Sequence, residues 1–485
     1  MKKLIALLLA AIMVMSMFAA CADTGSNQTD PPKTTSGSND TTTAPKDDTT
    51  TTPVESGEVS TDWILEEDTS MSGVVNFWIP FKENQGMAAL IAEFNEIYPN
   101  IEVKLTSYNN NADGNILVNT AMHSGEVDVL ASFNLENTYR RWSNGLFLDI
   151  TDKCEEEGID LIEQWGTNAY TYEDKIYTFP SGGRSHYVII NMTLWKEAGL
   201  DEKYNGLPTE WTWDEYLEAC AAMTKVGANG EVEVYGGTDY HNFDYVANAY
   251  ASVVGKNAYY NEDGTASFDN DYVVNALTRE LKAELVDKIW YSRATYSGDN
   301  TQTQDIYCAG VAATAITNNT IRFLHDANYG VDFISGFAPY PVEEKGQTNY
   351  LSGVCPFSHS GIAVNCQDED AAWAFLKWYS TYGVKYLVAA GHQSNWKGTE
   401  AGTAIEVIYG SEEEAEKWVD VESFTRVVGR TDLPSYYEDE LTAYTDVSST
   451  LKEYVMYACA GEMTAEEAMK AAADQANKAI EDAAD

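Results

Sequence analysis

Three short stretches of the chain, at positions 78–82, 108–113 and 132–136, combine aromatic rings with amide and charged side chains. The candidate ligand-contacting residues in them are Trp78, Lys82, Tyr108, Asn110, Asp113, Asn134 and Glu136. Such groups form hydrogen bonds and offer flat apolar faces, which suits the reversible binding of a polar molecule. No G-x-S-x-G, H-E-x-x-H, phosphate-binding glycine loop or S-x-x-K motif stands in a context suited to catalysis. The pattern therefore favours binding over reaction, and we expect no catalytic residue.

Each stretch directly follows a segment that the hydrophobic pattern predicts to be a β-strand. Residues 73–80, 101–108 and 127–132 are short runs rich in apolar and β-branched residues, with predicted helices at 86–98 and 114–125 between them. Strands and helices that alternate in this way predict a parallel α/β sheet. Ligands of open α/β sheets bind beyond the carboxyl ends of the strands. The three stretches should therefore meet at one edge of one sheet.

The first 60 residues predict export and attachment to a membrane. Two lysines precede an uncharged run from residue 4 to residue 20, which is typical of a signal peptide. Cys21 ends the stretch FAAC, which resembles the lipobox of bacterial lipoproteins, where the cysteine carries the lipid. We interpret residues 1–20 as a signal peptide and residues 21–60, rich in Thr, Ser, Asp and Pro, as a disordered tether on the outer face of the cell membrane. The alternative is an ordinary secretory peptide cut near residue 20.

Residues 61–485 are long enough to form two lobes and carry a strong negative charge. A single hydrophobic core serves up to about 250–300 residues, so this region predicts more than one core. The whole chain has 76 acidic and 30 basic residues and a net charge of -46. That charge repels nucleic acids and anionic membrane surfaces. We expect a monomer that binds no nucleic acid and depends on a lipid for its attachment to the membrane.

Several conspicuous residues are better explained by structure than by function. Thr212 and Glu215 have the spacing of a helix-capping box, as do Thr464 and Glu467. Trp373 and Leu376 lie one helical turn apart and should be core residues, as should Cys220 on the apolar side of a predicted helix. Six cysteines follow Cys21 without any C-x-x-C pair, so we expect no zinc site and no cofactor, and disulfide pairing is left open.

A series of blocks between residues 72 and 485 follows the order found in one known family. The blocks are AEFNEIYPNIEVKL, SGEVDVL, NGLFLDITD, YEDKIYTFP, INMTLWKEAGLD, LPTEWTWDEY, YCAGVAATAITNN, GFAPYP and AAWAFLKWYST. They resemble blocks of the family 1 extracellular solute-binding proteins, the carbohydrate-type substrate-binding lipoproteins of bacterial ABC importers. The resemblance implies an α/β protein with the type II periplasmic-binding-protein fold, in which two α/β lobes are joined by a hinge and enclose an interlobe ligand cleft.

The resemblance also implies where the chain passes between lobes. We expect one crossing at FPSGGRSHYVIIN and another at NYLSGVCPFSHSG. The first lobe would then comprise about 72–181 and 306–352, and the second lobe about 184–303 and 355–485. Seven further candidate ligand-contacting residues follow from this arrangement and from side-chain type: Arg184, His186, Tyr240, His241, Asn242, Asn319 and Trp396.

The usual ligands of the family are sugars and oligosaccharides, so the resemblance implies a protein that binds a carbohydrate and delivers it to ABC permease subunits. Two alternatives stay open. The same fold could serve a glycan-binding or sensory lipoprotein without transport. A surface glycosidase would instead need two carboxylates across a cleft, and 76 acidic residues do not exclude such a pair.

Overall fold

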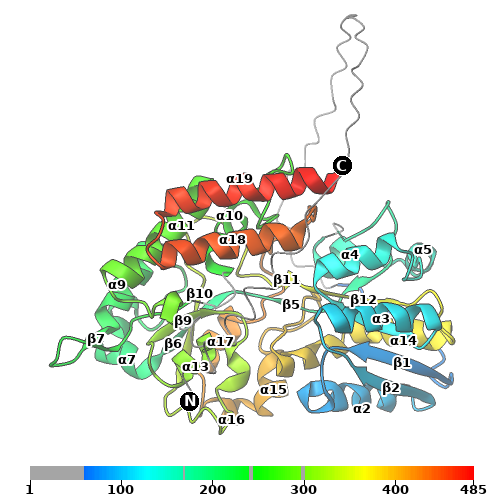
Figure 1. The fold of residues 1–485 in the computed structure, drawn as a ribbon. Helices are drawn as coiled ribbons and strands as arrows, with labels where there is room; N and C mark the ends of the chain where they lie inside the picture. Colours follow the sequence, from blue (N-terminus) through cyan, green and yellow to red (C-terminus); the bar gives the residue numbers. More distant parts are fainter. Residues whose placement is uncertain (1–58, 168–169, 240–243, 296–300, 485) are drawn as a thin grey trace, which may run out of the picture. The chain divides into compact units, whose positions relative to one another are not determined.

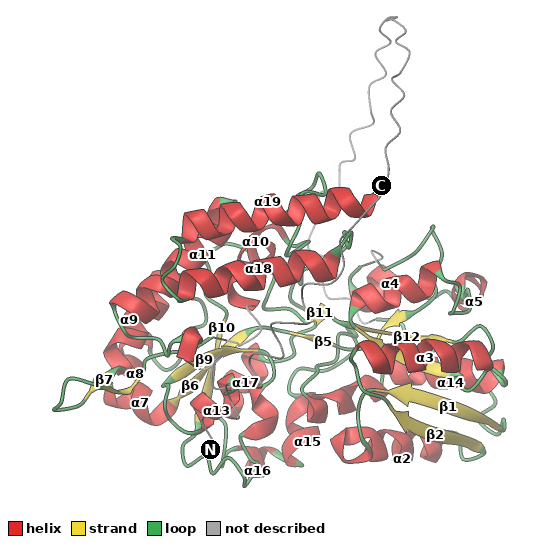
Figure 2. Cartoon of the chain, viewed as in Figure 1, coloured by secondary structure: helices red, strands yellow, loops and turns green. Residues whose placement is uncertain are grey.

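The computed structural model describes residues 59–167, 170–239, 244–295 and 301–484. From residue 59 onward the chain forms two α/β lobes, each built around its own sheet, and short connecting segments link them (Figure 1). Figure 2 shows the strands of each sheet flanked by helices. The predicted two-lobe α/β fold is confirmed.

The first lobe contains a five-stranded mixed sheet. In spatial order its strands are β2 (Ile101–Ser107), β1 (Gly73–Ile79), β3 (Val129–Phe133), β12 (Ser358–Ile362) and β4 (Phe179–Pro180). β1 pairs in parallel with β2 and β3, as the alternation of strands and helices predicted. β12 runs antiparallel between β3 and β4. The carboxyl ends of β1, β2 and β3 consequently lie at the same edge.

Helices cover both faces of this sheet because alternate strand residues point to opposite sides. Phe77 and Ile79 of β1 belong to the buried cluster that includes α2 and α14, whereas Trp78 packs with α3 and α4. The helices of the lobe are η1 (Glu83–Met87), α2 (Ala88–Ile97), α3 (Ala112–Ser124), α4 (Leu135–Ser143), α5 (Thr151–Glu157), α6 (Leu161–Trp165), α14 (Glu369–Ser380) and η4 (Gly383–Ala390).

The second lobe contains a three-stranded antiparallel sheet in the order β10 (Ser335–Pro339), β6 (Tyr187–Asn191) and β9 (Thr314–Thr317). Val188 and Ile190 face one core, and Tyr187 and Ile189 face the other. A two-stranded sheet of β7 (Lys225–Val226) and β8 (Val232–Val234) lies at the edge of the lobe, where Val234 packs against the core of Val188 and Ile190. α18 and α19 pack side by side on this lobe (Figure 1).

The helices of the second lobe come from two separate parts of the chain. The first part supplies α7 (Met192–Glu197), α8 (Leu200–Tyr204), α9 (Trp213–Met223), α10 (Asp244–Val254), α11 (Asp271–Leu281), η2 (Lys282–Val286), α13 (Thr303–Cys308) and η3 (Thr320–Phe323). The second part supplies α15 (Thr403–Tyr409), α16 (Glu412–Ala415), α17 (Val421–Val427), α18 (Tyr444–Cys459) and α19 (Ala465–Ala484).

Three segments of the chain cross between the lobes and are hydrogen-bonded to one another. β5 (Gly183–Arg184) pairs antiparallel with β11 (Cys355–Pro356). On its other side, the Gly183 N–H donates to the Gln393 carbonyl at 2.8 Å, and the Gln393 N–H donates back at 2.9 Å. A Cβ at position 183 would lie 2.1 Å from the Cys355 carbonyl oxygen, so this close approach requires glycine. β5 lies in space between the other two crossing segments and is therefore hydrogen-bonded on both sides.

The expected division of the chain between the lobes is wrong in two places. β9 and β10 pair with β6, so residues 306–352 belong to the second lobe. β12 pairs with β3 and β4, so the segment that begins near residue 355 returns to the first lobe before a third crossing near residue 393. All four residues of β9 are buried, and a fully buried run does not indicate which of two sheets it joins.

The structural roles predicted for individual residues are confirmed. Glu215 Oε2 accepts the Thr212 N–H at 3.0 Å and the Glu215 N–H donates to Thr212 Oγ1 at 3.3 Å, which forms the capping box of α9. The same reciprocal pair joins Thr464 and Glu467. Trp373, Leu376 and Cys220 are buried. Within the described ranges the six cysteines after residue 58 are free, and no helix there is long and apolar enough to span a membrane.

Candidate ligand site

A pocket of about 430 Å³ lies at the carboxyl-end edge of the first-lobe sheet, beside the crossing segments. The residues that line it are Pro80, Phe81, Tyr108, Asn109, Asn110, Asn111, Phe133, Arg184, Phe357 and His392. Its volume falls in the range of about 300–1,000 Å³ that is usual for small-molecule sites. All three sequence stretches singled out after β1, β2 and β3 contribute to it, so their predicted convergence is confirmed.

One wall of the pocket is aromatic and surrounds the His392 ring. The ring centroids of Phe81, Phe133 and Phe357 lie 5.3, 5.0 and 5.6 Å from that of His392. Phe81 and Phe133 also meet edge to face at 4.9 Å. Phe81 and Phe133 are buried, whereas Phe357 is half-buried and presents apolar ring surface, which can stack against the C–H face of a sugar ring.

The loop after β2 supplies amide groups. Asn111 caps α3 by accepting the Gly114 N–H on Oδ1 at 2.9 Å, and Asn110 Oδ1 accepts from the Asn115 side chain at 3.2 Å. Tyr108 donates its hydroxyl to the Ala131 carbonyl at 2.9 Å, and burial raises its pKa to about 12. The Tyr108 hydroxyl and the Asn110 Oδ1 are thus both used within the fold, and Asn110 lies on a loop that lines the pocket.

Arg184 and His392, which both line the pocket, contact the same Phe357 ring. The Arg184 guanidinium carbon lies 4.3 Å from the centroid of the Phe357 ring, a cation–π contact. His392 is buried, and its pKa lies well below the ordinary value because of burial and the positive charges of Arg184 and Arg322. The imidazole is consequently neutral, and Arg184 provides the positive charge of the pocket lining.

Three of the predicted ligand-contacting residues line the pocket: Tyr108, Asn110 and Arg184. Tyr240, His241 and Asn242, together with the predicted lipidation site Cys21, lie outside the described residues. Eight others have different surroundings: Trp78, Lys82, Asp113, Asn134, Glu136, His186, Asn319 and Trp396.

The two tryptophans that were predicted to contact the ligand are core residues. Trp78 is 8% exposed and packs between the first-lobe sheet and its helices. Trp396 is 3% exposed and donates its indole N–H to Gln164 Oε1 at 2.8 Å. Neither is among the residues that line the pocket.

Four polar candidates of the first lobe stabilise helices or face solvent. Lys82 is exposed immediately before η1, and Asp113 is exposed in the first turn of α3. Asn134 caps α4 by accepting the Glu136 N–H at 2.9 Å. Glu136 pairs with Arg140 at 2.6 Å and also accepts the Thr445 hydroxyl of α18 at 2.5 Å, which joins the two lobes.

The remaining two candidates are buried on the second-lobe side of the crossing segments. His186 Nε2 lies 3.4 Å from the Asn248 amide nitrogen and 3.3 Å from that of Asn318. Asn319 follows β9, and its backbone N–H donates to Thr317 Oγ1 at 3.3 Å. Both residues lie close to the crossing segments but do not line the pocket.

Sequence reasoning missed the aromatic wall and His392. Phe81 and Phe133 lie within the stretches at 78–82 and 132–136, but the prediction named only tryptophan, tyrosine and polar residues there. Phe357 lies in the crossing segment NYLSGVCPFSHSG, so a search for aromatic residues there would have found it. His392 had no local signal, because it reaches the pocket only through the third crossing.

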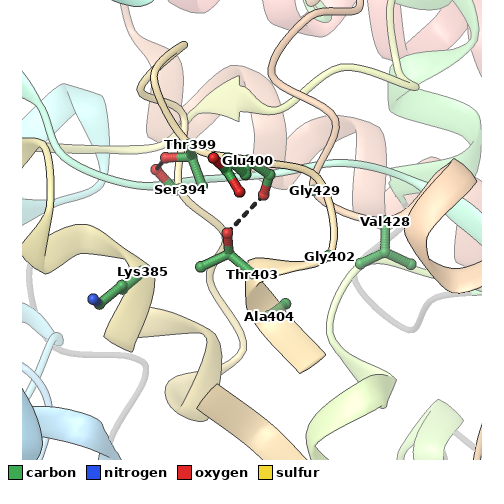
Figure 3. A pocket seen from close by; sticks show the side chains of 9 residues that line it. All are labelled: Lys385, Ser394, Thr399, Glu400, Gly402, Thr403, Ala404, Val428 and Gly429. Carbon is green, nitrogen blue, oxygen red and sulfur yellow. Dashed lines mark hydrogen bonds between the residues drawn. The ribbon is translucent and has the colours of Figure 1, made fainter. Parts of the chain in front are cut away.

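Two other features could be mistaken for sites. A small pocket of about 20 Å³ lies beside Ser394, Thr399 and Thr403, and the Thr403 hydroxyl donates to the Glu400 carbonyl at 2.7 Å (Figure 3). It has room for about one water molecule and not for a larger solute. In the described part of the chain, one cluster, Glu280, Glu284 and Cys459, has metal-ligand chemistry, but Arg293 is bound to Glu280 and already supplies positive charge there.

The two lobes, the linked crossing segments and the pocket at the strand ends are those of a solute-binding protein. Residues 80–386 match the family described as bacterial extracellular solute-binding protein, and the chain belongs to that family. No match is found among curated proteins.

Solved structures of sugar-binding proteins share the fold. A sugar transporter from Rhizobium etli, in an open conformation, has a TM-score of 0.67 at 15% identity, covering 83% of this chain and 98% of that chain. An ABC substrate-binding protein from Listeria monocytogenes in complex with cycloalternan has a TM-score of 0.61 at 18% identity, with coverages of 85% and 100%. The sugar-binding protein MalE from Xanthomonas citri has a TM-score of 0.62 at 16% identity, with coverages of 84% and 98%.

Proposed function

We propose that this protein binds a sugar or oligosaccharide between its lobes and delivers it to the permease subunits of an ABC importer. The observation that carries the proposal is the pocket at the strand ends, which combines an aromatic wall with asparagine amides and a guanidinium. A sugar presents C–H groups on its faces and hydroxyls at its edges, and these match rings and hydrogen-bonding groups respectively. The cycloalternan complex of the Listeria monocytogenes protein and the sugar-binding description of the Xanthomonas citri protein support the same ligand class.

Ligand binding would act by closing the hinge. A ligand that contacts both lobes does so only in the closed form, so its binding free energy shifts the population toward that form. To change the ratio of closed to open molecules from 1:99 to 99:1, the ligand must bind the closed form about 5.5 kcal/mol more strongly than the open form. The binding free energies of a few hydrogen bonds and one stacked aromatic ring add up to about this value. No side chain has to react, and the solute is released unchanged.

Calorimetry of the purified protein against a panel of oligosaccharides tests the proposal directly. We expect saturable binding of at least one glycan, which is recovered intact after prolonged incubation. Absence of binding across a broad panel would contradict a carbohydrate ligand. Hydrolysis products would favour the glycosidase alternative, although the pocket lining contains no Asp or Glu to act as the required carboxylate pair.

Delivery and anchoring need separate tests. Deletion of the adjacent permease genes should abolish uptake of the bound glycan, whereas a purely sensory or glycan-binding lipoprotein would leave uptake unchanged. We also propose that Cys21 carries the lipid that holds the protein on the outer face of the membrane. Cys21→Ser should release the protein into the medium, and its retention in the membrane fraction would refute lipidation at this residue.

A further inference from the structure

The charge of the pocket is opposite to that of the protein. The chain carries 76 acidic residues against 30 basic ones. The ten residues that line the pocket nevertheless include Arg184 and no Asp or Glu. A binding site for an anionic ligand needs a guanidinium that is not already paired with a carboxylate of the protein. A binding site for an uncharged ligand has no such requirement, so the lining favours an anionic ligand.

Arg184 differs from every other arginine in having no polar partner among the residues that the structure describes. Its side chain forms no hydrogen bond and no ion pair within the described ranges, and its Nε is buried without an acceptor. Each of the other arginines donates a hydrogen bond or pairs with a carboxylate; these are Arg140, Arg141, Arg279, Arg293, Arg322, Arg426 and Arg430. A buried donor without an acceptor costs free energy, which an incoming acceptor would recover.

The surroundings of Arg184 fix its guanidinium without using its donors. The side chain lies over the Phe357 ring at 4.3 Å, and its backbone is part of β5, which is held by β11 and by Gln393. A cation–π contact is not a hydrogen bond, so it uses none of the N–H donors of Arg184. A planar fork held in this way suits bidentate pairing with a carboxylate.

His392 adds a second unused polar atom in the same pocket. Its Nδ1 is buried and has no hydrogen-bond partner among the described residues. The ring is enclosed by Phe81, Phe133 and Phe357, which restricts its orientation. A neutral imidazole nitrogen can exchange a hydrogen bond with a hydroxyl group next to the carboxylate.

We propose that the solute is an acidic glycan, a sugar or oligosaccharide that carries a uronate carboxylate, and that Arg184 pairs with this carboxylate. The inference rests on the proposed carbohydrate function and narrows it to one chemical class. Phe357, the half-buried ring of the aromatic wall, contacts an apolar face of the sugar, and His392 contacts a hydroxyl.

Calorimetry with matched ligands tests the class of solute. The probes are trigalacturonate, its fully methyl-esterified form, a sulfated galactose trisaccharide, and the neutral trisaccharides maltotriose, cellotriose and xylotriose. We expect trigalacturonate to bind at least about tenfold more tightly than its methyl ester, since a charge-assisted hydrogen bond is lost on esterification. Its affinity should also fall as salt is raised from about 0.05 to 0.5 M.

Three variants test the role of Arg184. Arg184→Gln should weaken trigalacturonate binding about ten- to hundredfold, and Arg184→Lys should restore part of the loss because it keeps the charge without the fork. Arg426→Gln is the matched control, since that arginine pairs with the exposed Glu422 of α17 at 3.6 Å, and it should leave the affinity unchanged. Circular dichroism confirms that each variant is folded.

The possible results separate the two proposals. Equal binding of acidic and neutral trisaccharides, with no effect of Arg184→Gln, overturns the acidic-glycan proposal and leaves the carbohydrate function intact. Arginine-dependent binding of the sulfated trisaccharide alone overturns the assignment of a carboxylate. Binding of none of these glycans, with Arg184-dependent binding of citrate or an acidic peptide, overturns both proposals.

Discussion

Arg184 and Arg293 are two arginines in contrasting settings. Arg293 is fully buried in the second lobe, where its side chain is bonded to Asp239 and Glu280 and its backbone N–H donates to Glu284 at 3.0 Å. Arg184 lies at the pocket and faces an aromatic ring, and its side chain donates no hydrogen bond within the described ranges. One guanidinium is neutralised by the protein itself, and the other is left for something that arrives from outside. A charge that the fold does not use thus identifies a binding residue better than its residue type does.

The carboxylates around Arg293 outnumber it. Burial, the negative charge of Glu280 and the neighbouring Asp239 raise the pKa of Glu284 well above its ordinary value, against the opposing effect of Arg293. The raised pKa favours the protonated form of Glu284, which reduces the excess negative charge of the cluster. The buried guanidinium of the second lobe is thus paired within the protein, as expected for a structural network.

The largest expected effect is that of removing the paired arginine. Arg293→Met should lower the free energy of unfolding by about 3–5 kcal/mol, because it leaves buried carboxylates without their counter-charge. Arg426→Met, at an exposed ion pair, should lower it by less than about 0.5 kcal/mol. Chemical denaturation followed by circular dichroism measures both. A loss below about 1 kcal/mol for Arg293→Met would remove the distinction between the two arginines.

A half-buried carboxylate without a counter-charge should make stability depend on pH. Glu438 Oε2 is buried without a partner among the described residues, and burial raises the pKa of Glu438 from 4.5 to about 8. Unfolded Glu438 ionises from about pH 4.5, whereas the folded protein keeps the proton until about pH 8. Its contribution to stability is therefore complete below pH 4.5 and is lost as the pH rises through 8.

Glu438→Gln should remove this dependence. We expect the wild type to lose about 2 kcal/mol between pH 4.5 and 8 at this residue, less than the full shift implies because solvent screens the partly exposed side chain. Urea titrations at several pH values measure the slope. The exposed Glu262→Gln is the control, and an unchanged slope in Glu438→Gln would show that this carboxyl ionises normally in the folded protein.

A smaller effect is expected at the aromatic ring below Arg184. Phe357→Leu keeps apolar volume but removes the cation–π contact, and it should weaken binding of the acidic trisaccharide about three- to tenfold. Trp78→Phe should leave the dissociation constant unchanged and lower the free energy of unfolding, because Trp78 is a core residue. Equal losses of affinity in both variants would contradict this division between pocket and core.

The smallest expected effect concerns the stability of the Arg184 variant. Arg184→Gln breaks no hydrogen bond or ion pair within the described ranges, so the free energy of unfolding should change by less than about 0.5 kcal/mol. The same denaturation experiment used for Arg293→Met measures it. A loss above about 1 kcal/mol would mean that Arg184 stabilises the fold.

Local patterns predicted the scaffold and the position of the site. The alternation of strands and helices placed the stretches after β1, β2 and β3 together, and the Thr212 and Thr464 capping boxes were recognised from spacing alone. These predictions depend on residues that are neighbours in the chain or in adjacent strands. For that reason the sequence alone was sufficient for them.

The errors concern side-chain direction and long-range pairing. Trp78 belongs to β1, where a shift of one residue changes the face, so it packs under α3 and α4 while the pocket is reached by Phe81 beyond the strand end. The positions of Trp396 and His392 are determined by the third crossing segment near residue 393. The predicted division between the lobes had no crossing there. The surroundings of these two residues cannot be derived from local periodicity in the sequence.

The three crossing segments also determine the order in which the molecule can be assembled. The first-lobe sheet needs β12, whose position between β3 and β4 is filled only after most of the second lobe has been synthesised. The second lobe in turn needs α18 and α19, the last helices of the chain. Neither lobe can finish folding on its own during synthesis, so a chain cut at residue 352 would leave β4 without a neighbouring strand and both lobes incomplete.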